Sequence, residues 1–125
     1  IKPKCRVKKH LGRLPRIKCS QQKICQVIVN LLMNASQAME EKGVIRLSTY
    51  ARNGYVHLEV EDNGPGIPPE VVKRIFDPFF TTKEAGQGTG LGLSISYDVI
   101  KKHKGTMNVE SEIGKGTKFI IRLPI

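Results

Sequence analysis

Residues 44–67 read VIRLSTYARNGYVHLEVEDNGPGI, and this stretch decides the fold. Apolar and polar residues alternate on both sides of Asn53-Gly54, a dipeptide typical of a two-residue hairpin turn. The alternation predicts two antiparallel strands that bury one face, with the inward phase at Ile45, Leu47, Thr49, Val56, Leu58 and Val60. His57 has the polar phase, so we expect it to be an exposed strand residue. The glycines and proline of Asp62–Gly66 then predict a turn.

A long amphipathic helix is predicted before this hairpin, over about residues 21–42, with Ser20 as its N-cap and Gly43 at its end. Apolar residues recur in it at steps of three and four, namely Ile24, Val27, Ile28, Leu31, Leu32, Ala35, Ala38 and Met39. Cys25 lies within this apolar stretch, and we interpret it as a small core residue.

The remaining segments complete a layered fold. Extended segments are predicted at 4–11 and 16–19, a short helix from Pro68 to about 76, a helix at 91–103 ended by Gly105, and strands at 106–111 and 117–123. Tight turns between consecutive strands require antiparallel pairing, and each helix has one apolar stripe. The order predicts an α/β (α+β) two-layer sandwich, with a mixed, mostly antiparallel sheet of about five strands and three helices on one face.

Composition limits the class of protein. The chain has 125 residues, the usual size of one domain, and no apolar run approaches the roughly 20 residues that span a bilayer. It opens on Ile1-Lys2-Pro3-Lys4, so we expect a domain excised from a longer protein. Three cysteines without a Cys-x-x-Cys pair indicate neither a disulfide framework nor a zinc site. The net charge of +10 is compatible with nucleic acid, an anionic ligand, an acidic protein surface, or simply a solvated basic surface.

Two segments contain polar residues that a packed core does not need. Asn30 and Asn34 are four residues apart and share a helix face, where their carbonyl oxygens could serve Mg²⁺ beside phosphates. Asp62 ends a strand, where its carboxylate could accept a hydrogen bond from an adenine amino group, and the glycines of the turn allow the backbone to approach a flat ring closely. Each segment also has an ordinary interpretation, as exposed helix residues or as a simple turn.

Two glycine-rich segments follow. The run Gly86–Gly92 leads into a predicted helix, so its free N–H groups and the helix N-terminus suit phosphate. It follows a long loop and not a strand, and it lacks a Walker Lys-Ser/Thr ending, so neither a Rossmann nor a P-loop interpretation fits. The segment Gly114–Thr117 is locally a hairpin turn between the last two strands.

In this order and spacing, the segments resemble the ATP-binding catalytic domain of two-component sensor protein-histidine kinases. That family lies in the Bergerat (GHKL) superfamily, with type II topoisomerases, heat-shock chaperones and mismatch-repair ATPases. The resemblance covers roughly residues 17–125 and is most similar to the nitrogen-regulator type of sensor kinase. The matching motifs are Asn30–Asn34, Asp62–Gly66, Ile75–Phe80, Gly88–Gly92 and Gly114–Thr117. It implies one Bergerat-fold domain over 1–125, with residues 77–90 as a lid over the nucleotide.

The resemblance also implies roles for individual residues. Asn34 would ligate Mg²⁺, Asn30 would lie close to the metal and the phosphates, and Lys83 would place a cation near the γ-phosphate. The ATP-binding residues would be Asn34, Gln37, Ala38, Asp62, Gly64, Gly66, Ile67, Gly88, Thr89, Gly90, Leu91, Gly92 and Thr117.

Asn30 also selects a branch of the superfamily. Members that hydrolyse ATP resemble this pattern but have a Glu at that position, and Asn cannot act as a base at neutral pH. The resemblance therefore implies binding of Mg-ATP (or ADP) and donation of the γ-phosphoryl group to a histidine on a separate dimerisation domain. None of His10, His57 and His103 precedes an acidic residue, as the acceptor histidine usually does, so we expect all three to be surface residues and the acceptor to lie elsewhere.

The expected partners are the histidine-containing dimerisation domain of the parent kinase and, through the parent, a response regulator. We expect the domain to act in the cytoplasm without contacting membrane or nucleic acid. Two alternatives stay open: an ATPase or serine kinase of the same superfamily, and a basic nucleic-acid-binding module that rests only on net charge.

Overall fold

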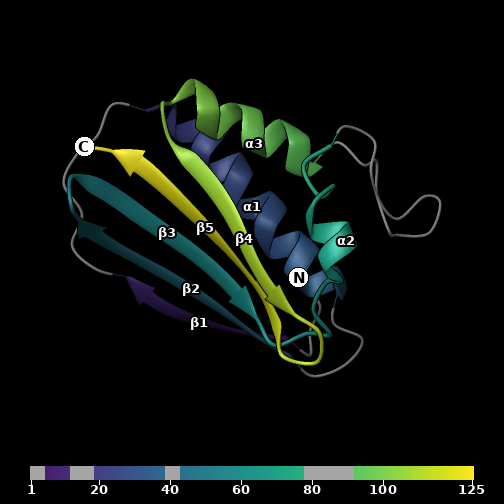
Figure 1. The fold of residues 1–125 in the computed structure, drawn as a ribbon. Helices are drawn as coiled ribbons and strands as arrows, with labels where there is room; N and C mark the ends of the chain where they lie inside the picture. Colours follow the sequence, from purple (N-terminus) through teal and green to yellow (C-terminus); the bar gives the residue numbers. More distant parts are fainter. Residues whose placement is uncertain (1–4, 12–18, 39–42, 78–91) are drawn as a thin grey trace.

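Two layers make up the fold: a sheet, and helices that pack on one of its faces (Figure 1). This computed structural model describes residues 5–11, 19–38, 43–77 and 92–125. Its elements are β1 (Cys5–Leu11), α1 (Gln21–Ala38), β2 (Gly43–Arg52), β3 (Tyr55–Asp62), α2 (Pro69–Val72), α3 (Gly92–Lys102), β4 (Thr106–Glu112) and β5 (Gly116–Pro124). The predicted two-layer sandwich is confirmed. Within the described residues, no helix has the length and apolar character needed to cross a membrane.

The sheet has the strand order β1-β2-β3-β5-β4. β1 pairs with β2 in parallel, and the three other pairs are antiparallel, which confirms a mixed, mostly antiparallel sheet. The hairpin between β2 and β3 turns at Asn53 and Gly54, whose φ angles of 53° and 81° fit a type I′ turn. Its register places Asp62, the last residue of β3, beside Ile45 on one side and Thr117 on the other.

The core lies between the sheet and the helices. Side chains on one face of the sheet pack against the apolar stripes of α1 and α3. The buried cluster that they form comprises Val27, Leu31, Ala35, Ile45, Leu58, Val60, Ile75, Ile100, Met107, Phe119, Ile121 and Leu123. The predicted inward phase of the hairpin is thus confirmed at Ile45, Leu58 and Val60, while Leu47 packs against the cluster partly buried. Phe76 packs there too, with its ring centroid 5.0 Å from that of Tyr97.

Two predictions about exposure are wrong. His57 is only 8 % exposed, because the ring of Tyr50 on the neighbouring strand stacks on it with centroids 4.6 Å apart. Cys25 is exposed and does not belong to the core. The stripe of α1 centres near Val27 and Leu31, and two residues along a helix turn the side chain by roughly 200°, to the other side.

The predicted cause for the end of α3 was Gly105, and the structure shows a different one. The helix ends at Lys102, and the left-handed residue after it is Lys104, with φ of 62°. The N–H of Gly105 donates to the carbonyl of Ile100 at 3.0 Å, as in a Schellman motif. Gly105 is needed for a different reason than helix termination, since a Cβ there would lie 2.3 Å from the carbonyl oxygen of Arg122.

Several other predicted boundaries differ from the structure or lie outside the described residues. The short helix α2 covers only four residues, and turns continue from it to Asp77. Gly43 already belongs to β2, so α1 ends before it. The predicted extended segment at 16–19 and the predicted lid at 77–90 lie almost wholly outside the described residues.

Candidate functional site

The candidate site begins where β3 and β5 lie side by side at one end of the sheet. Asp62 and Thr117 are register partners, and each is 7 % exposed. Both have the strand phase of the core residues Val60 and Phe119, so their side chains lie on the helix-bearing face. The Asp62 carboxylate accepts the N–H of Gly64 at 2.9 Å, which closes the turn after β3.

Burial raises the pKa of the Asp62 carboxyl above its ordinary value. The backbone N–H groups of Gly64 and Thr117 oppose this rise by donating to the carboxylate, and the neighbouring charge of Glu61 adds to it. No salt bridge involves Asp62 in the part of the chain that the structure describes. The carboxylate is therefore a buried acceptor supported by neutral donors only.

Thr117 belongs to a hydroxyl network that joins three segments. Ser111 of β4 accepts the N–H of Ile67 at 2.7 Å and donates to the carbonyl of Gly116 at 3.0 Å. Its oxygen also lies 2.9 Å from the hydroxyl oxygen of Thr117. The network ties the segment after the Asp62–Gly66 turn to the β4–β5 hairpin. Ser111 was not among the residues predicted from the sequence.

Glycines bring the backbone of the turn and the hairpin together. Gly66 has φ of 82°, and a Cβ on it would lie 2.3 Å from the carbonyl oxygen of Glu112. Gly116 has φ of 134°, and its Cβ would lie 2.0 Å from the carbonyl oxygen of Asp62. The N–H of Gly114 donates to the carbonyl of Pro65 at 2.8 Å. Gly66 is thus required by the hairpin backbone, whereas the predicted approach of this turn to a flat ring stays a prediction.

The two asparagines lie one turn apart on α1 and are both half-buried. The side-chain oxygen of Asn30 accepts from Gln26 at 3.2 Å, and its amide nitrogen donates to Ser96 at 3.3 Å. Ser96 is fully buried, so its bond with Asn30 is a polar link between α1 and α3. No group of three or more His, Cys, Asp or Glu residues suited to a metal occurs in the described parts of the chain.

Other predicted residues are placed less completely. Gly92 is the first residue of α3, so the glycine run does lead into a helix N-terminus. Gln37 and Ala38 are in the last turn of α1, and only their backbone is described. Ile67 packs partly buried against the core. Lys83, Gly88, Thr89, Gly90 and Leu91 lie outside the described residues.

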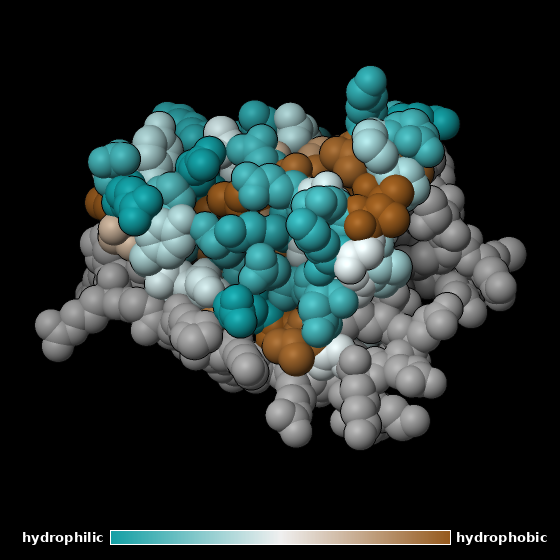
Figure 2. Space-filling view, turned by 60° about the horizontal axis from the view of Figure 1, so that its bottom comes forward, coloured by the Kyte–Doolittle hydropathy of each residue, from teal (hydrophilic) through white to brown (hydrophobic). Residues whose placement is uncertain are grey.

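A separate hollow of about 570 Å³ lies on the opposite, open face of the sheet, and we call it the open-face hollow. Its lining comprises Val44, Arg46, Glu61, Asp62, Asn63, Glu110, Ser111, Glu112, Lys115, Gly116, Thr117 and Lys118. Asp62 and Thr117 also line this hollow, although their side chains have the phase of the core residues. Figure 2 turns the lower side of Figure 1 toward the reader, and hydrophilic side chains cover most of the described surface there.

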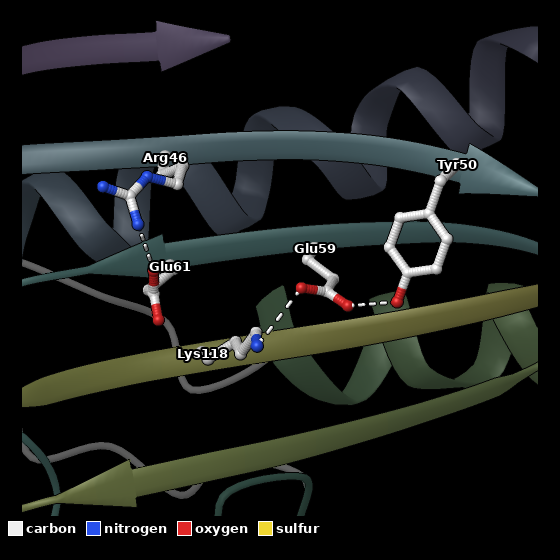
Figure 3. Close-up of polar contacts among 5 residues, drawn as sticks. All are labelled: Arg46, Tyr50, Glu59, Glu61 and Lys118. Carbon is white, nitrogen blue, oxygen red and sulfur yellow. Dashed lines mark hydrogen bonds and ion pairs between the residues drawn. The ribbon is translucent and has the colours of Figure 1, made fainter. Parts of the chain in front are cut away.

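The charges of this open face pair with one another (Figure 3). Arg46 lies 3.2 Å from Glu61, and Lys118 lies 3.2 Å from Glu59, which also accepts from the Tyr50 hydroxyl at 2.5 Å. Burial acts to raise the pKa of Glu59, but the bonds from Tyr50 and Lys118 outweigh it and lower that pKa. The lining of the open-face hollow combines three basic residues with four acidic ones, so it lacks the excess of positive charge that would attract a phosphate.

Comparison with known proteins identifies one matching family, described as histidine kinase-, DNA gyrase B- and HSP90-like ATPases, over residues 19–125. The sensor kinase CckA of Brucella abortus is 50 % identical over 116 residues, which cover 79 % of this chain and 12 % of that protein. The sensor histidine kinase ZraS of Escherichia coli K12 is 39 % identical over 112 residues, covering 90 % of this chain and 24 % of that protein. The chain thus spans a quarter or less of the length of these relatives.

Solved structures agree with the fold. The nucleotide-free catalytic domain of the histidine kinase ThkA superposes with a TM-score of 0.85 at 36 % identity, covering 97 % of this chain and 79 % of that one. Full-length ShkA in complex with AMPPNP gives a TM-score of 0.85 at 30 % identity, covering 96 % of this chain and 25 % of that one.

Proposed function

The chain belongs to the family of histidine kinase-, DNA gyrase B- and HSP90-like ATPases and is a catalytic domain of the histidine-kinase type; on this premise we propose that it binds Mg-ATP and donates the γ-phosphoryl group to a histidine. The observation that carries the proposal is the buried acceptor pair of Asp62 and Thr117. The backbone N–H groups of Gly64 and Thr117 leave further lone pairs on the Asp62 carboxylate that can accept another donor. The amino group of adenine is such a donor.

The adenine end of the proposed site is held by backbone packing. Gly66 and Gly116 let the turn after β3 and the β4–β5 hairpin meet at distances that no side chain would allow. This fixes Asp62 and Ile67 relative to Thr117 before any ligand binds. A site whose groups are already in place loses less entropy when the nucleotide binds.

The phosphate end is assigned to α1 and the start of α3. The side-chain oxygen of Asn34 is a hard ligand suited to Mg²⁺, and the N-terminus of α3 at Gly92 favours negative charge. No acidic metal cluster occurs among the described residues, so the ion would be held mainly by the nucleotide phosphates together with Asn34. The chemistry that Mg²⁺ would supply there is neutralisation of phosphate charge during transfer. Lys83, Gly88, Thr89 and Gly90, from the segment at 77–90 that we propose as the lid, complete the proposed site together with Leu91, which follows that segment.

Asn30 supports transfer over hydrolysis. Its oxygen accepts from Gln26 and its nitrogen donates to Ser96, so the amide is oriented between the two helices. An amide has no basic lone pair at neutral pH and cannot activate water. The γ-phosphoryl group would therefore be kept for another acceptor, and catalysis would rest on positioning and charge stabilisation.

The acceptor histidine is proposed to lie on a separate dimerisation domain. His57 is buried beneath the ring of Tyr50, so its imidazole is not accessible to a phosphoryl donor. His103, also expected at the surface, is half-buried: it accepts the N–H of Ser20 at 3.0 Å through Nε2, and its Nδ1 lies 2.8 Å from the Val99 carbonyl. Both nitrogens of His103 thus have structural partners, and the side chain of His10 is not described. A response regulator would then receive the phosphoryl group through the parent kinase, in the cytoplasm.

The test is phosphoryl transfer from labelled ATP to a supplied histidine domain. We expect the wild-type chain to label that domain and the Asn34→Ala variant to lose most of the labelling. Asn108→Ala is the matched control, because Asn108 is an exposed asparagine of β4 on the open face and should leave labelling unchanged. Rapid release of inorganic phosphate by the wild-type chain alone, without labelling, would overturn the proposal in favour of an ATPase.

A further inference from the structure

The Ser111 hydroxyl group has three partners at the proposed adenine end. It lies 2.7 Å from the Ile67 nitrogen, 3.0 Å from the Gly116 carbonyl oxygen and 2.9 Å from the Thr117 hydroxyl oxygen. Ser111 is half-buried on β4, directly across from Thr117 in the register of β4 and β5. Three polar partners around one hydroxyl leave a single consistent arrangement of its proton.

A serine hydroxyl has one proton to donate and two lone pairs that accept. The Ile67 N–H can only donate, and the Gly116 carbonyl can only accept. The single Ser111 proton therefore goes to Gly116. Thr117 must then donate its own proton to Ser111, because that is the only way to satisfy all three partners. The Thr117 oxygen is left as a hydrogen-bond acceptor toward any ligand.

The neighbouring group has the same polarity. Asp62 pairs with Thr117 in the sheet register, and its carboxylate accepts hydrogen bonds from the backbone N–H of Gly64 and of Thr117. A carboxylate and a hydroxyl whose proton is already used form two adjacent acceptors. Two adjacent acceptors suit a group that brings two hydrogens.

We propose that Ser111 is a positioning residue that makes the site specific for 6-amino purine nucleotides over 6-oxo purine nucleotides, by holding Thr117 as an acceptor. This rests on the proposed function. The 6-amino group of adenine offers two N–H donors, whereas the 6-oxo group of hypoxanthine is an acceptor. A 6-oxo group would leave acceptors facing one another without a proton between them, which a buried polar site rejects strongly.

The test is the ratio of affinities for ATP and inosine triphosphate, measured by calorimetric titration with Mg²⁺ present. We expect the wild-type chain to prefer ATP. In Ser111→Ala, Thr117 regains a free proton that can turn to the 6-oxo oxygen, and the ATP preference should fall about tenfold, the value of one hydrogen bond. Ser111→Thr keeps a hydroxyl at the same place and should retain the preference. Ser48→Ala, on the open face of β2, is the control and should leave the ratio unchanged.

The outcomes separate the two proposals. A wild-type chain that binds neither nucleotide overturns the proposed function and this inference together. A wild-type chain that prefers ATP, with an unchanged ratio in a folded Ser111→Ala, overturns the inference alone. Equal losses of affinity for both nucleotides would assign Ser111 a merely structural role. Should Ser111→Ala not fold, Ser111→Cys replaces it with a much weaker hydrogen-bonding group and the same expected fall in the ratio.

Discussion

Replacing Gly66 by alanine tests the backbone contact that holds the proposed adenine end. Gly66 and Gly114 have nearly the same left-handed φ, 82° and 85°. A Cβ on Gly66 would lie 2.3 Å from the Glu112 carbonyl oxygen, whereas a Cβ on Gly114 would meet nothing within 4 Å. Gly114→Ala is therefore a matched control for the strain in φ, and the difference between the two variants isolates the close approach.

The expected magnitudes follow from these two contributions. Left-handed backbone costs an ordinary residue roughly 1–2 kcal/mol, and both variants should lose about this much stability. Overpacking typically adds about 1–3 kcal/mol, and the neighbour at Gly66 is backbone that cannot rotate away. We expect Gly66→Ala to be destabilised by about 2–5 kcal/mol in total, and Gly114→Ala by about 1–2 kcal/mol.

The assay is urea unfolding of the wild-type chain and both variants, with the slope of the transition checked for equality. Gly54→Ala, with φ of 81° and nothing within 4 Å of its Cβ, is a second control and should match Gly114→Ala. ATP affinity should also fall in Gly66→Ala at temperatures where it is folded, because the turn that bears Asp62 must move. Equal unfolding midpoints for Gly66→Ala and Gly114→Ala would refute the close approach of turn and hairpin.

Four further predictions concern the proposed nucleotide site. Because burial raises the pKa of Asp62, ATP affinity should begin to fall on acidification at a higher pH than the ordinary aspartate range; titrations at several pH values should show this step in the wild-type chain and not in Asp62→Asn. The stability of the fold should depend on pH in the opposite direction to ATP affinity. A raised folded-state pKa favours the protonated carboxyl, so the contribution of Asp62 to the free energy of unfolding is lost as pH rises through that pKa. Asp62→Asn should therefore gain stability relative to wild type toward neutral pH. Ser96→Ala should remove the acceptor of the Asn30 amide nitrogen and lower the rate of phosphoryl transfer about tenfold with a smaller effect on ATP affinity, as single-turnover and binding measurements would show; equal effects on both would count against it. Mg²⁺ alone should bind only weakly by calorimetry and should bind well once ATP is present, since the described residues hold no acidic metal cluster; tight binding of Mg²⁺ alone would contradict the assignment of the metal to Asn34 and the phosphates.

Local patterns were enough to predict the sheet and its helices. The alternation around Asn53-Gly54 predicted β2 and β3, and the Asn-Gly turn has the φ angles that this dipeptide favours. The helical spacing of Val27 and Leu31 likewise predicted the buried stripe of α1. These signals depend on a few neighbouring residues, so one sequence contains them in full.

Features that depend on cross-strand neighbours could not be predicted in the same way. His57 has the polar phase of its strand, and only the register with Tyr50 shows that a ring covers it. Ser111 is one polar residue in β4, and its role arises from Ile67, which is 44 residues away in the chain. A more general signal was available for Ser111, since a serine in the inward phase of a strand requires partners.

A nucleotide that lacks the 6-amino group tests the proposed hydrogen bond between the base and Asp62. ATP and purine riboside triphosphate differ only in the 6-amino group, so their affinities should be compared in the wild-type chain and in Asp62→Ala. We expect the wild-type chain to prefer ATP by about tenfold or more, and we expect that preference to be much smaller in Asp62→Ala, where only the Thr117 oxygen remains as an acceptor. Equal affinities in the wild-type chain, or an undiminished preference in Asp62→Ala, would contradict the proposed hydrogen bond.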